Sequence, residues 1–263
     1  MFGLFKSKPV IDQDEFDWQL ACFKWLLQEF EGLERLRKTP LVLPTVDFFP
    51  ESKTKGHARA TELFDQVRYF AHMTEWPCRL VEGEAAREMH VGNTLLLRHQ
   101  HKQPPLGTFS YVDGQYQISY NPSEIVRPLN LIATFAHELS HYLMHTAVGG
   151  VPGGRELNEL ATDVSAVFLG FGIFLANTAK TFEQHQDFAE YGWQARRQGY
   201  LSELGLVTAL SIFVELSGTS HDDARTHLKP YLQGVYKKAV RYLKAAHPDL
   251  GSDILALDLS EYA

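Results

Sequence analysis

Residues 129–144 read LNLIATFAHELSHYLM, and their apolar residues recur at the three- and four-residue spacing of one helical face. Within this helix His137 and His141 are four residues apart, so both imidazoles leave the same face one turn from each other. Two neutral imidazoles placed in this way can bind one Zn²⁺ ion, each at about 2.0–2.1 Å. Glu138 lies slightly round the helix, where its carboxylate can reach a water on the metal but not the metal itself. The sequence therefore predicts a metal-binding helix.

A catalytic zinc ion usually has three protein ligands and one open position, so a third ligand has to come from elsewhere. His145 is on the same helix, but it lies about 12 Å along the axis from His137, so the three imidazoles cannot converge. The extended metzincin pattern is absent, because it requires Gly and His where this chain has Met144 and Ala147. We expect His145 to be a capping or surface residue.

The better candidate lies across the glycine-rich loop 149–154, where NELATD (158–163) opens a second, apolar helix. Glu159 and Asp163 are four residues apart and share one face of it. Negative charge near a helix N-terminus complements the helix dipole, and this alternative explains Glu156 and can explain Glu159. It explains Asp163 poorly, because that residue lies further in, among apolar residues, where a carboxylate has to be paired or linked to a metal.

The arrangement that explains both carboxylates places Glu159 on the zinc ion as the third ligand. Asp163 then accepts the outward N–H of His137, which orients the imidazole ring and raises its basicity. The predicted metal ligands are therefore His137, His141 and Glu159. Asp163 is predicted to orient His137 by a hydrogen bond, and Glu138 is the predicted general base.

These motifs resemble those of the gluzincin metallopeptidases, the clan of thermolysin, whose best-known members carry HExxH followed by Asn-Glu-x-x-Ser-Asp. Here the second motif reads Asn-Glu-x-x-Thr-Asp, and the resemblance likewise implies Glu159 as third ligand and Asp163 as its supporting carboxylate. The run 117–141 also resembles small cytoplasmic bacterial zinc peptidases. The resemblance covers about residues 108–178 and implies a peptide or protein substrate. The chain departs from thermolysin in lacking a secretion signal and obvious calcium-binding loops, so a digestive role is not implied.

In such a reaction zinc activates a water, Glu138 takes its proton and returns it to the leaving amine, and a further donor stabilises the oxyanion. The sequence does not choose among the candidate donors, which are Tyr191, Tyr200, Arg196, Arg197 and His221. Two rival functions stay open: a regulatory or binding protein that keeps a zinc site with little or no turnover, and a hydrolase of a non-peptide amide. Glu138 speaks against the first rival, because metal binding alone does not need it.

Before the zinc motif, the sequence predicts helices followed by a small sheet. Apolar residues at helical spacing indicate helices over about 14–37 and 57–73. Short apolar runs at Cys78–Val81 and Thr94–Leu97 are strand candidates.

A β-hairpin is the clearest local feature of this part. Alternating runs at 109–112 and 116–120 flank Asp113-Gly114, a dipeptide that suits a tight turn with positive φ at both positions. The strand 115–120 is a candidate for the sheet edge on which an extended peptide substrate adds as a further strand.

From Pro128 onward the pattern is helical, with helices expected over about 128–147, 156–178, 181–199, 203–217 and 222–246. The predicted fold class is α+β, with N-terminal helices, a small sheet with a β-hairpin, the HExxH helix and a helical C-terminal half. We expect one zincin-like domain over residues 1–263. Its parts are a helical N-terminal part, the sheet with the metal-binding helices, and a helical C-terminal part, over 1–75, 76–178 and 179–263.

The composition narrows the class of protein. With 44% hydrophobic residues the chain can bury a sizeable core, and a net charge of -7 argues against a nucleic-acid binder. Two cysteines, Cys22 and Cys78, make no disulfide framework and suggest a reducing compartment. The longest apolar stretch, Val164–Ala176, is shorter than the roughly 20 residues of a membrane span. We expect a cytoplasmic protein without an integral membrane segment, and its oligomeric state stays open.

The last long helix is basic on one face and apolar on the other. Its cations are Lys237, Lys238, Arg241 and Lys244. A basic amphipathic helix can lie on a membrane surface. On an acidic protein without a second anchor it is more often a solvated face, and that is the interpretation adopted for this helix.

Overall fold

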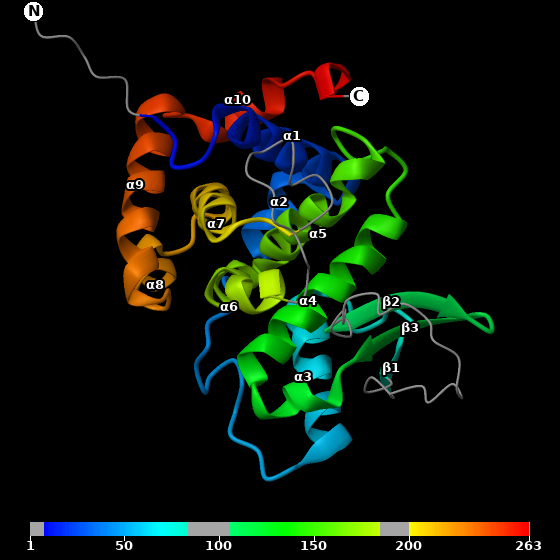
Figure 1. Cartoon of the computed structure of the whole chain (residues 1–263). Helices are drawn as coiled ribbons and strands as arrows, with labels where there is room; N and C mark the ends of the chain where they lie inside the picture. Colours follow the sequence, from blue (N-terminus) through cyan, green and yellow to red (C-terminus); the bar gives the residue numbers. More distant parts are fainter. Residues whose placement is uncertain (1–7, 84–105, 185–199, 263) are drawn as a thin grey trace, which may run out of the picture.

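The computed structural model describes residues 8–83, 106–184 and 200–262, and it is a mixture of helices and a small sheet (Figure 1). This content is consistent with the α+β class. The strand expected at Thr94–Leu97 lies outside the described residues, as does most of the helix expected over 181–199.

Three helices form the N-terminal part of the fold: α1 (Gln13–Glu29), α2 (Gly32–Lys38) and α3 (Gly56–Phe70). The third agrees with the helix expected there, but the single helix expected over 14–37 is wrong. The chain turns at Glu31 and Gly32, whose φ angles of 62° and 71° cannot occur within a right-handed helix. The apolar spacing continues through the turn because α1 and α2 both face the core, so the pattern hides the break.

The sheet has three strands, β1 (Arg79–Glu82), β2 (Gly107–Val112) and β3 (Gln115–Tyr120), in the order β1-β3-β2. β1 runs parallel to β3, and β2 runs antiparallel to it. Asp113 and Gly114 have φ angles of 51° and 81°, so the predicted hairpin turn is confirmed. β3 is the central strand, which means that the expectation of a sheet edge at 115–120 is wrong. Within the hairpin, the strand at the edge of this sheet is β2.

Helix α4 (Pro128–His145) lies between the sheet and the helical part of the fold (Figure 1). It packs against β2 and β3 on one side and against α3, α5 and α6 on others. Pro128 begins the helix, where its missing N–H costs no helical hydrogen bond. Phe135 and Leu139 are fully buried, so the helix is held by contacts with the core.

The second apolar helix is interrupted. It consists of α5 (Asn158–Ala166), a π-helical turn (Val167–Phe171) and α6 (Gly172–Gln184). By length and composition the stretch Arg155–Lys180 could cross a membrane, but 94% of its most apolar window is buried inside the protein. Such burial is typical of a core helix and gives no clear sign of an integral membrane segment.

The loop between α4 and α5 is attached to α1. The indole N–H groups of Trp18 and Trp25 donate to the carbonyls of Pro152 and Gly149, at 2.9 and 3.3 Å. The Glu29 carboxylate accepts the backbone N–H groups of residues 148 and 149. The aromatic face of α1 therefore serves packing, and it holds the connection between the two helices that carry the predicted ligands.

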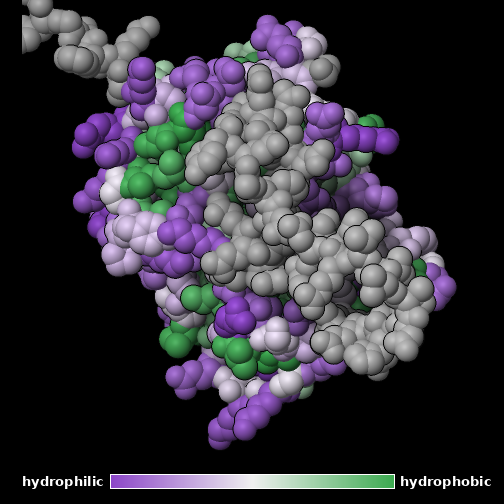
Figure 2. All heavy atoms as spheres, viewed as in Figure 1, coloured by the Kyte–Doolittle hydropathy of each residue, from purple (hydrophilic) through white to green (hydrophobic). Residues whose placement is uncertain are grey.

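The C-terminal part is helical, with elements α7 (Glu203–Ser217), α8 (His221–Thr226), α9 (Pro230–Ala246) and α10 (Leu250–Ala256). The single helix expected over 222–246 is therefore wrong. Its pattern joins α8 and α9, which are separate because Pro230 starts a new helix. α7 is buried almost throughout and packs against α6 and α9. Figure 2 shows the surface of this part, where an apolar area lies among hydrophilic residues.

Gly170 makes the interruption between α5 and α6 possible. Its φ is 95°, and a Cβ at this position would overlap the carbonyl oxygen of Pro40. Its own carbonyl accepts the N–H of Val42 at 3.0 Å, which joins the helix to the segment after α2. We predict that Gly170→Ala lowers the free energy of unfolding by about 3 kcal/mol, because it combines backbone strain with overpacking.

The measurement is chemical denaturation beside the control Gly150→Ala, whose added methyl meets nothing within 4 Å. We expect little change in the control. Equal stability of the two variants would contradict this account of the interruption.

Candidate metal centre

Two helices bring three metal-binding groups together. His137 and His141 come from α4, and Glu159 comes from the first turn of α5. Their ligand atoms all lie within 4.8 Å of one another. The structure therefore places the three predicted ligands in one cluster, although sequence separates Glu159 from the histidines by the loop that α1 holds.

The spacing of the three atoms suits a tetrahedral ion. The two Nε2 atoms are 3.1 Å apart, and Glu159 Oε2 lies 3.4 Å from that of His137 and 3.6 Å from that of His141. Ligands held at 2.0–2.1 Å around a tetrahedral zinc ion are separated by about 3.3 Å. The cluster therefore fits zinc with almost no rearrangement.

The outer nitrogen of each imidazole has its own acceptor. His137 Nδ1 lies 3.0 Å from Asp163 Oδ1, and His141 Nδ1 lies 3.3 Å from the Thr162 hydroxyl. That hydroxyl donates its proton to the carbonyl of Asn158 at 2.8 Å, so toward His141 it acts as an acceptor. Both Nδ1 atoms then carry hydrogen, and both Nε2 atoms face the centre of the cluster, which is the orientation that metal binding requires.

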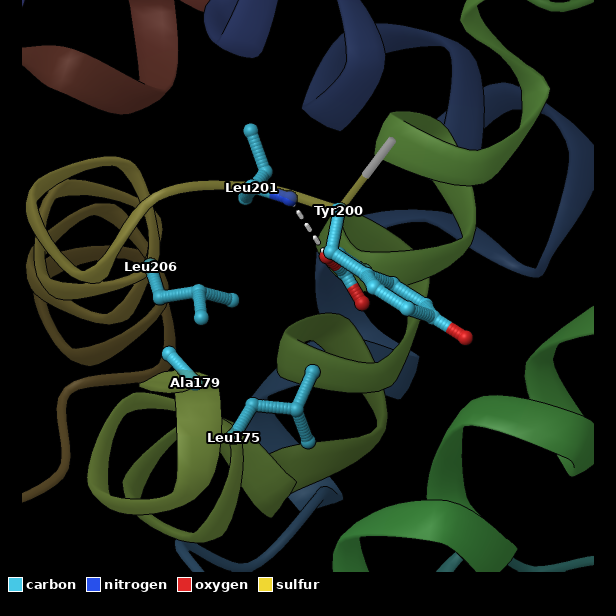
Figure 3. A pocket seen from close by; sticks show the side chains of 6 residues that line it. Leu175, Ala179, Tyr200, Leu201 and Leu206 are labelled. Atoms are coloured by element: carbon cyan, nitrogen blue, oxygen red, sulfur yellow. Dashed lines mark hydrogen bonds between the residues drawn. The ribbon is translucent and has the colours of Figure 1, made fainter. Parts of the chain in front are cut away.

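Asp163 is buried, with 3% of its surface exposed, and it uses both of its oxygens. One accepts from His137, and the other accepts the backbone N–H of Leu201 at 2.7 Å, drawn as a dashed line in Figure 3. The residue therefore occupies the position that the sequence predicted for it behind His137. The bond to Leu201 also ties the cluster to the start of α7, a link that no sequence pattern signals.

Without an ion, protons have to hold the cluster together. Burial lowers the pKa of His137, but hydrogen bonds with Asp163 and Glu159 outweigh it and raise the pKa to about 10. The same contacts work in the opposite direction on Glu159, where hydrogen bonds with His137 and His141 hold the carboxyl pKa far below its usual range. The metal-free site is thus an imidazolium beside a carboxylate, and a divalent cation would replace the proton.

Glu138 lies beside the cluster but is not part of it. Burial raises the pKa of its carboxyl, while the nearby charges of His137 and His141 and the Phe109 backbone oppose that rise. β2 approaches closely here, because a Cβ at Gly107 would lie 2.6 Å from the Thr134 methyl and 3.0 Å from the Glu138 carboxylate. Gly107 is thus a residue that the sequence analysis missed, and it lets the strand lie directly over the predicted base.

The cluster opens into a cleft of about 300 Å³. Glu138, Tyr200 and residues 107–109 of β2 line the cleft with the three clustered residues. Tyr200 stacks edge-to-face on His137 with 4.9 Å between ring centroids, and its hydroxyl points away from the apolar side chains of Leu175 and Leu206 (Figure 3). Burial, followed by the charge of Asp163, raises the pKa of that hydroxyl, so it stays protonated and can donate.

His221, another candidate for an oxyanion donor, does not line the described cleft. His221 lies between α7 and α9, at hydrogen-bond distance from Glu215 and Tyr236. Tyr191, Arg196 and Arg197 lie outside the described residues. His145 is exposed and lies against the rings of Phe109 and Tyr116, away from the cluster, in agreement with the expectation of a surface residue.

No protein-family model, curated protein or solved structure matches this chain. The comparisons therefore show neither a family nor an activity. The resemblance to gluzincins rests on the two sequence motifs, and the function has to be argued from the geometry of the site.

The first prediction for this site concerns its third ligand. Glu159→Ala should weaken zinc binding by more than about 100-fold, because it removes one of three ligands, whereas Asp163→Ala should cost about 10–100-fold. Glu156→Ala is the matched control and should bind zinc like the unchanged protein. The affinities are measured by competition with a chromophoric chelator. A control that loses zinc while Glu159→Ala keeps it would show that the wrong carboxylate has been assigned.

A second prediction concerns pH. The pKa of His137, about 10 in the metal-free fold, lies above its unfolded value of 6.5. The proton therefore stabilises the metal-free protein fully below about pH 6.5, and this stabilisation is lost as the pH rises toward 10. Zinc has to displace the same proton, so its affinity should rise about tenfold per pH unit from pH 6 to 8. Glu159 stays ionised over this range and adds no slope. An affinity that does not change with pH would contradict the protonated metal-free site.

Proposed function

We propose that this protein is a zinc-dependent metallopeptidase of the gluzincin type, with the ion held by His137, His141 and Glu159. The observation that carries the proposal is the set of three facing ligand atoms at tetrahedral spacing, 3.1–3.6 Å apart. A cluster that only stabilised the fold would not need Glu138 in the same cleft. Its carboxylate is 5% exposed and belongs to the cleft wall without joining the ligands.

Zinc is the ion that this donor set favours. Two imidazole nitrogens and one carboxylate oxygen make the His₂Glu set of catalytic zinc sites, which leave a fourth position open. Calcium and magnesium prefer oxygen ligands throughout and larger coordination numbers or bound waters. The cleft lies on the side of the cluster where that fourth position would open.

When bound, zinc lowers the pKa of a water toward neutrality and polarises a carbonyl. The Glu138 carboxylate is placed to take the proton of an attacking water and to deliver it to the departing amine. Tyr200 presents a protonated hydroxyl at the same cleft and can donate to the oxygen on which negative charge develops. Asp163 keeps His137 in the tautomer that leaves its inner nitrogen free for the ion.

The shape of the cleft supports a peptide as substrate. Residues 107–109 of β2 form one wall, and among the described residues β2 pairs only with β3, so its other edge has no described partner strand. An extended peptide can add to such an edge through main-chain hydrogen bonds, which bring successive carbonyls past the metal. A non-peptide amide would not need this edge. A cytoplasmic location belongs to the same proposal, since the peptidases that the motifs resemble are cytoplasmic and Cys22 and Cys78 are both free.

The rival function is a regulatory or binding protein that retains zinc with little turnover. Glu138→Gln separates the two, because glutamine keeps the size of the side chain but cannot accept a proton at neutral pH. We predict that the variant keeps its zinc and that its peptidase activity falls by about two to four orders of magnitude. Activity is measured on a diverse quenched-fluorescent peptide library, with zinc content determined on the same samples.

Glu156→Gln is the matched control and should keep full activity. Tyr200→Phe should keep zinc and lower kcat more than it raises KM, because a donor to the oxyanion acts only in the transition state. Unchanged activity in Glu138→Gln would refute the mechanism. Zinc binding without cleavage of any library peptide by the unchanged protein would favour the regulatory function.

A further inference from the structure

A second hollow lies away from the metal centre, between the N-terminal segment and α9. Its volume is about 510 Å³, larger than that of the metal cleft, and within the size range of ligand sites. We refer to it as the α9 groove. Its cationic lining residues are Lys8, Lys238 and Arg241, and its apolar lining includes Val10, Leu204 and Val235. In Figure 1, α9 lies at the left edge of the molecule, whereas β2 lies at the right.

The cations of the α9 groove are not neutralised within the described parts of the chain. Lys8, Lys238 and Arg241 form no ion pair with any described residue. Lys244, one turn further along α9, differs in this respect, because it lies 3.8 Å from Glu215. On a chain with a net charge of -7, three unpaired cations around one hollow form a local positive potential that attracts anions.

The nearest acidic side chain on α7 already has partners. Glu203 precedes Leu204, and its carboxylate contacts Lys180 at 3.6 Å and the hydroxyl of Tyr231. It therefore does not neutralise the groove, and a ligand would have to bring its own negative charge.

The apolar residues of the α9 groove indicate that its ligand also has an apolar part. Val235 and Lys238 lie three residues apart on α9, so both line the same side of the helix. Leu204, at the start of α7, is 40% exposed although it is a large apolar side chain. Figure 2 shows an apolar area over α9 and α7, bordered by hydrophilic residues. A ligand that fits has carboxylates for the rim and an apolar side chain for the hollow.

We propose that the α9 groove binds an acidic peptide segment of a partner protein, in which carboxylates alternate with large apolar side chains. Lysine and arginine pair with carboxylates, arginine in a two-pronged geometry, while the hollow accepts an apolar anchor. A membrane fits less well, because apolar groups that enter a bilayer have to project from the surface and here they line a hollow. This inference does not depend on the proposed peptidase activity, since no groove residue lies in the metal cleft.

The test is fluorescence anisotropy with a labelled twelve-residue peptide of alternating Glu-Leu pairs, titrated with the full-length protein. We expect saturable binding that weakens as salt is raised, and a loss of at least about tenfold in affinity in Lys238→Glu and in Arg241→Glu. Val235→Asn, which keeps the charges, should also weaken binding. The matched control is Lys237→Glu, which makes the same charge change on an exposed part of α9 outside the groove and should stay within about twofold.

Thermal unfolding of each variant verifies that the fold is intact. Equal weakening by Lys238→Glu and Lys237→Glu would overturn the proposal, because it would reveal unspecific charge attraction. Equal binding of the corresponding Lys-Leu peptide would overturn it as well. A third result would also overturn it: the protein binds phosphatidylserine vesicles but not the peptide, and Lys238→Glu abolishes vesicle binding. The groove would then be a membrane-binding surface. His141→Ala should bind the peptide normally, which separates this test from that of the metal centre.

Discussion

The carboxylate of Asp163 is the point at which three helices of this protein meet. It sits on α5 with 3% exposure and accepts one hydrogen bond from His137 on α4 and another from the backbone of Leu201 before α7. A buried charge is tolerated only when its partners are in place, and removal of one partner from such a pair costs about 3–5 kcal/mol. This one residue therefore links α4, α5 and the segment before α7, and it orients His137.

The elements around Asp163 hold the polar cluster in place within an apolar core. α1 holds the loop between the ligand-bearing helices through two indoles and Glu29, so Glu159 reaches the histidines with little freedom. Gly107 lets β2 approach α4 closely enough to cover Glu138. The outer groups of the cluster contact Asp163 and Thr162, and at its centre three ligand atoms face one another. The convergence of these three atoms is the physical reason to propose a cation, and the covered carboxylate of Glu138 beside them is the reason to propose catalysis.

The two proposed sites lie in different parts of the molecule, and their charges differ in burial. In the metal centre, the burial of His137, Glu138 and Asp163 strengthens the interactions between charges, so the chemistry depends on a few buried atoms. In the α9 groove the charges are exposed and form no ion pair with a described residue, so recognition would depend on screening, shape and an apolar anchor.

The sequence by itself predicted which side chains share one face of each ligand-bearing helix, because helical spacing is a local property. His137 and His141 share a face whatever surrounds them, and Asp163 in an apolar run requires a partner wherever it is buried. The hairpin at Asp113-Gly114 is local in the same way. Only the tertiary structure decided that β3 is central, that the pattern over 14–37 breaks at Gly32, and that Tyr200 rather than His221 lies at the cleft. These features depend on contacts between residues far apart in the chain, and periodicity reports only which face is buried, not what buries it.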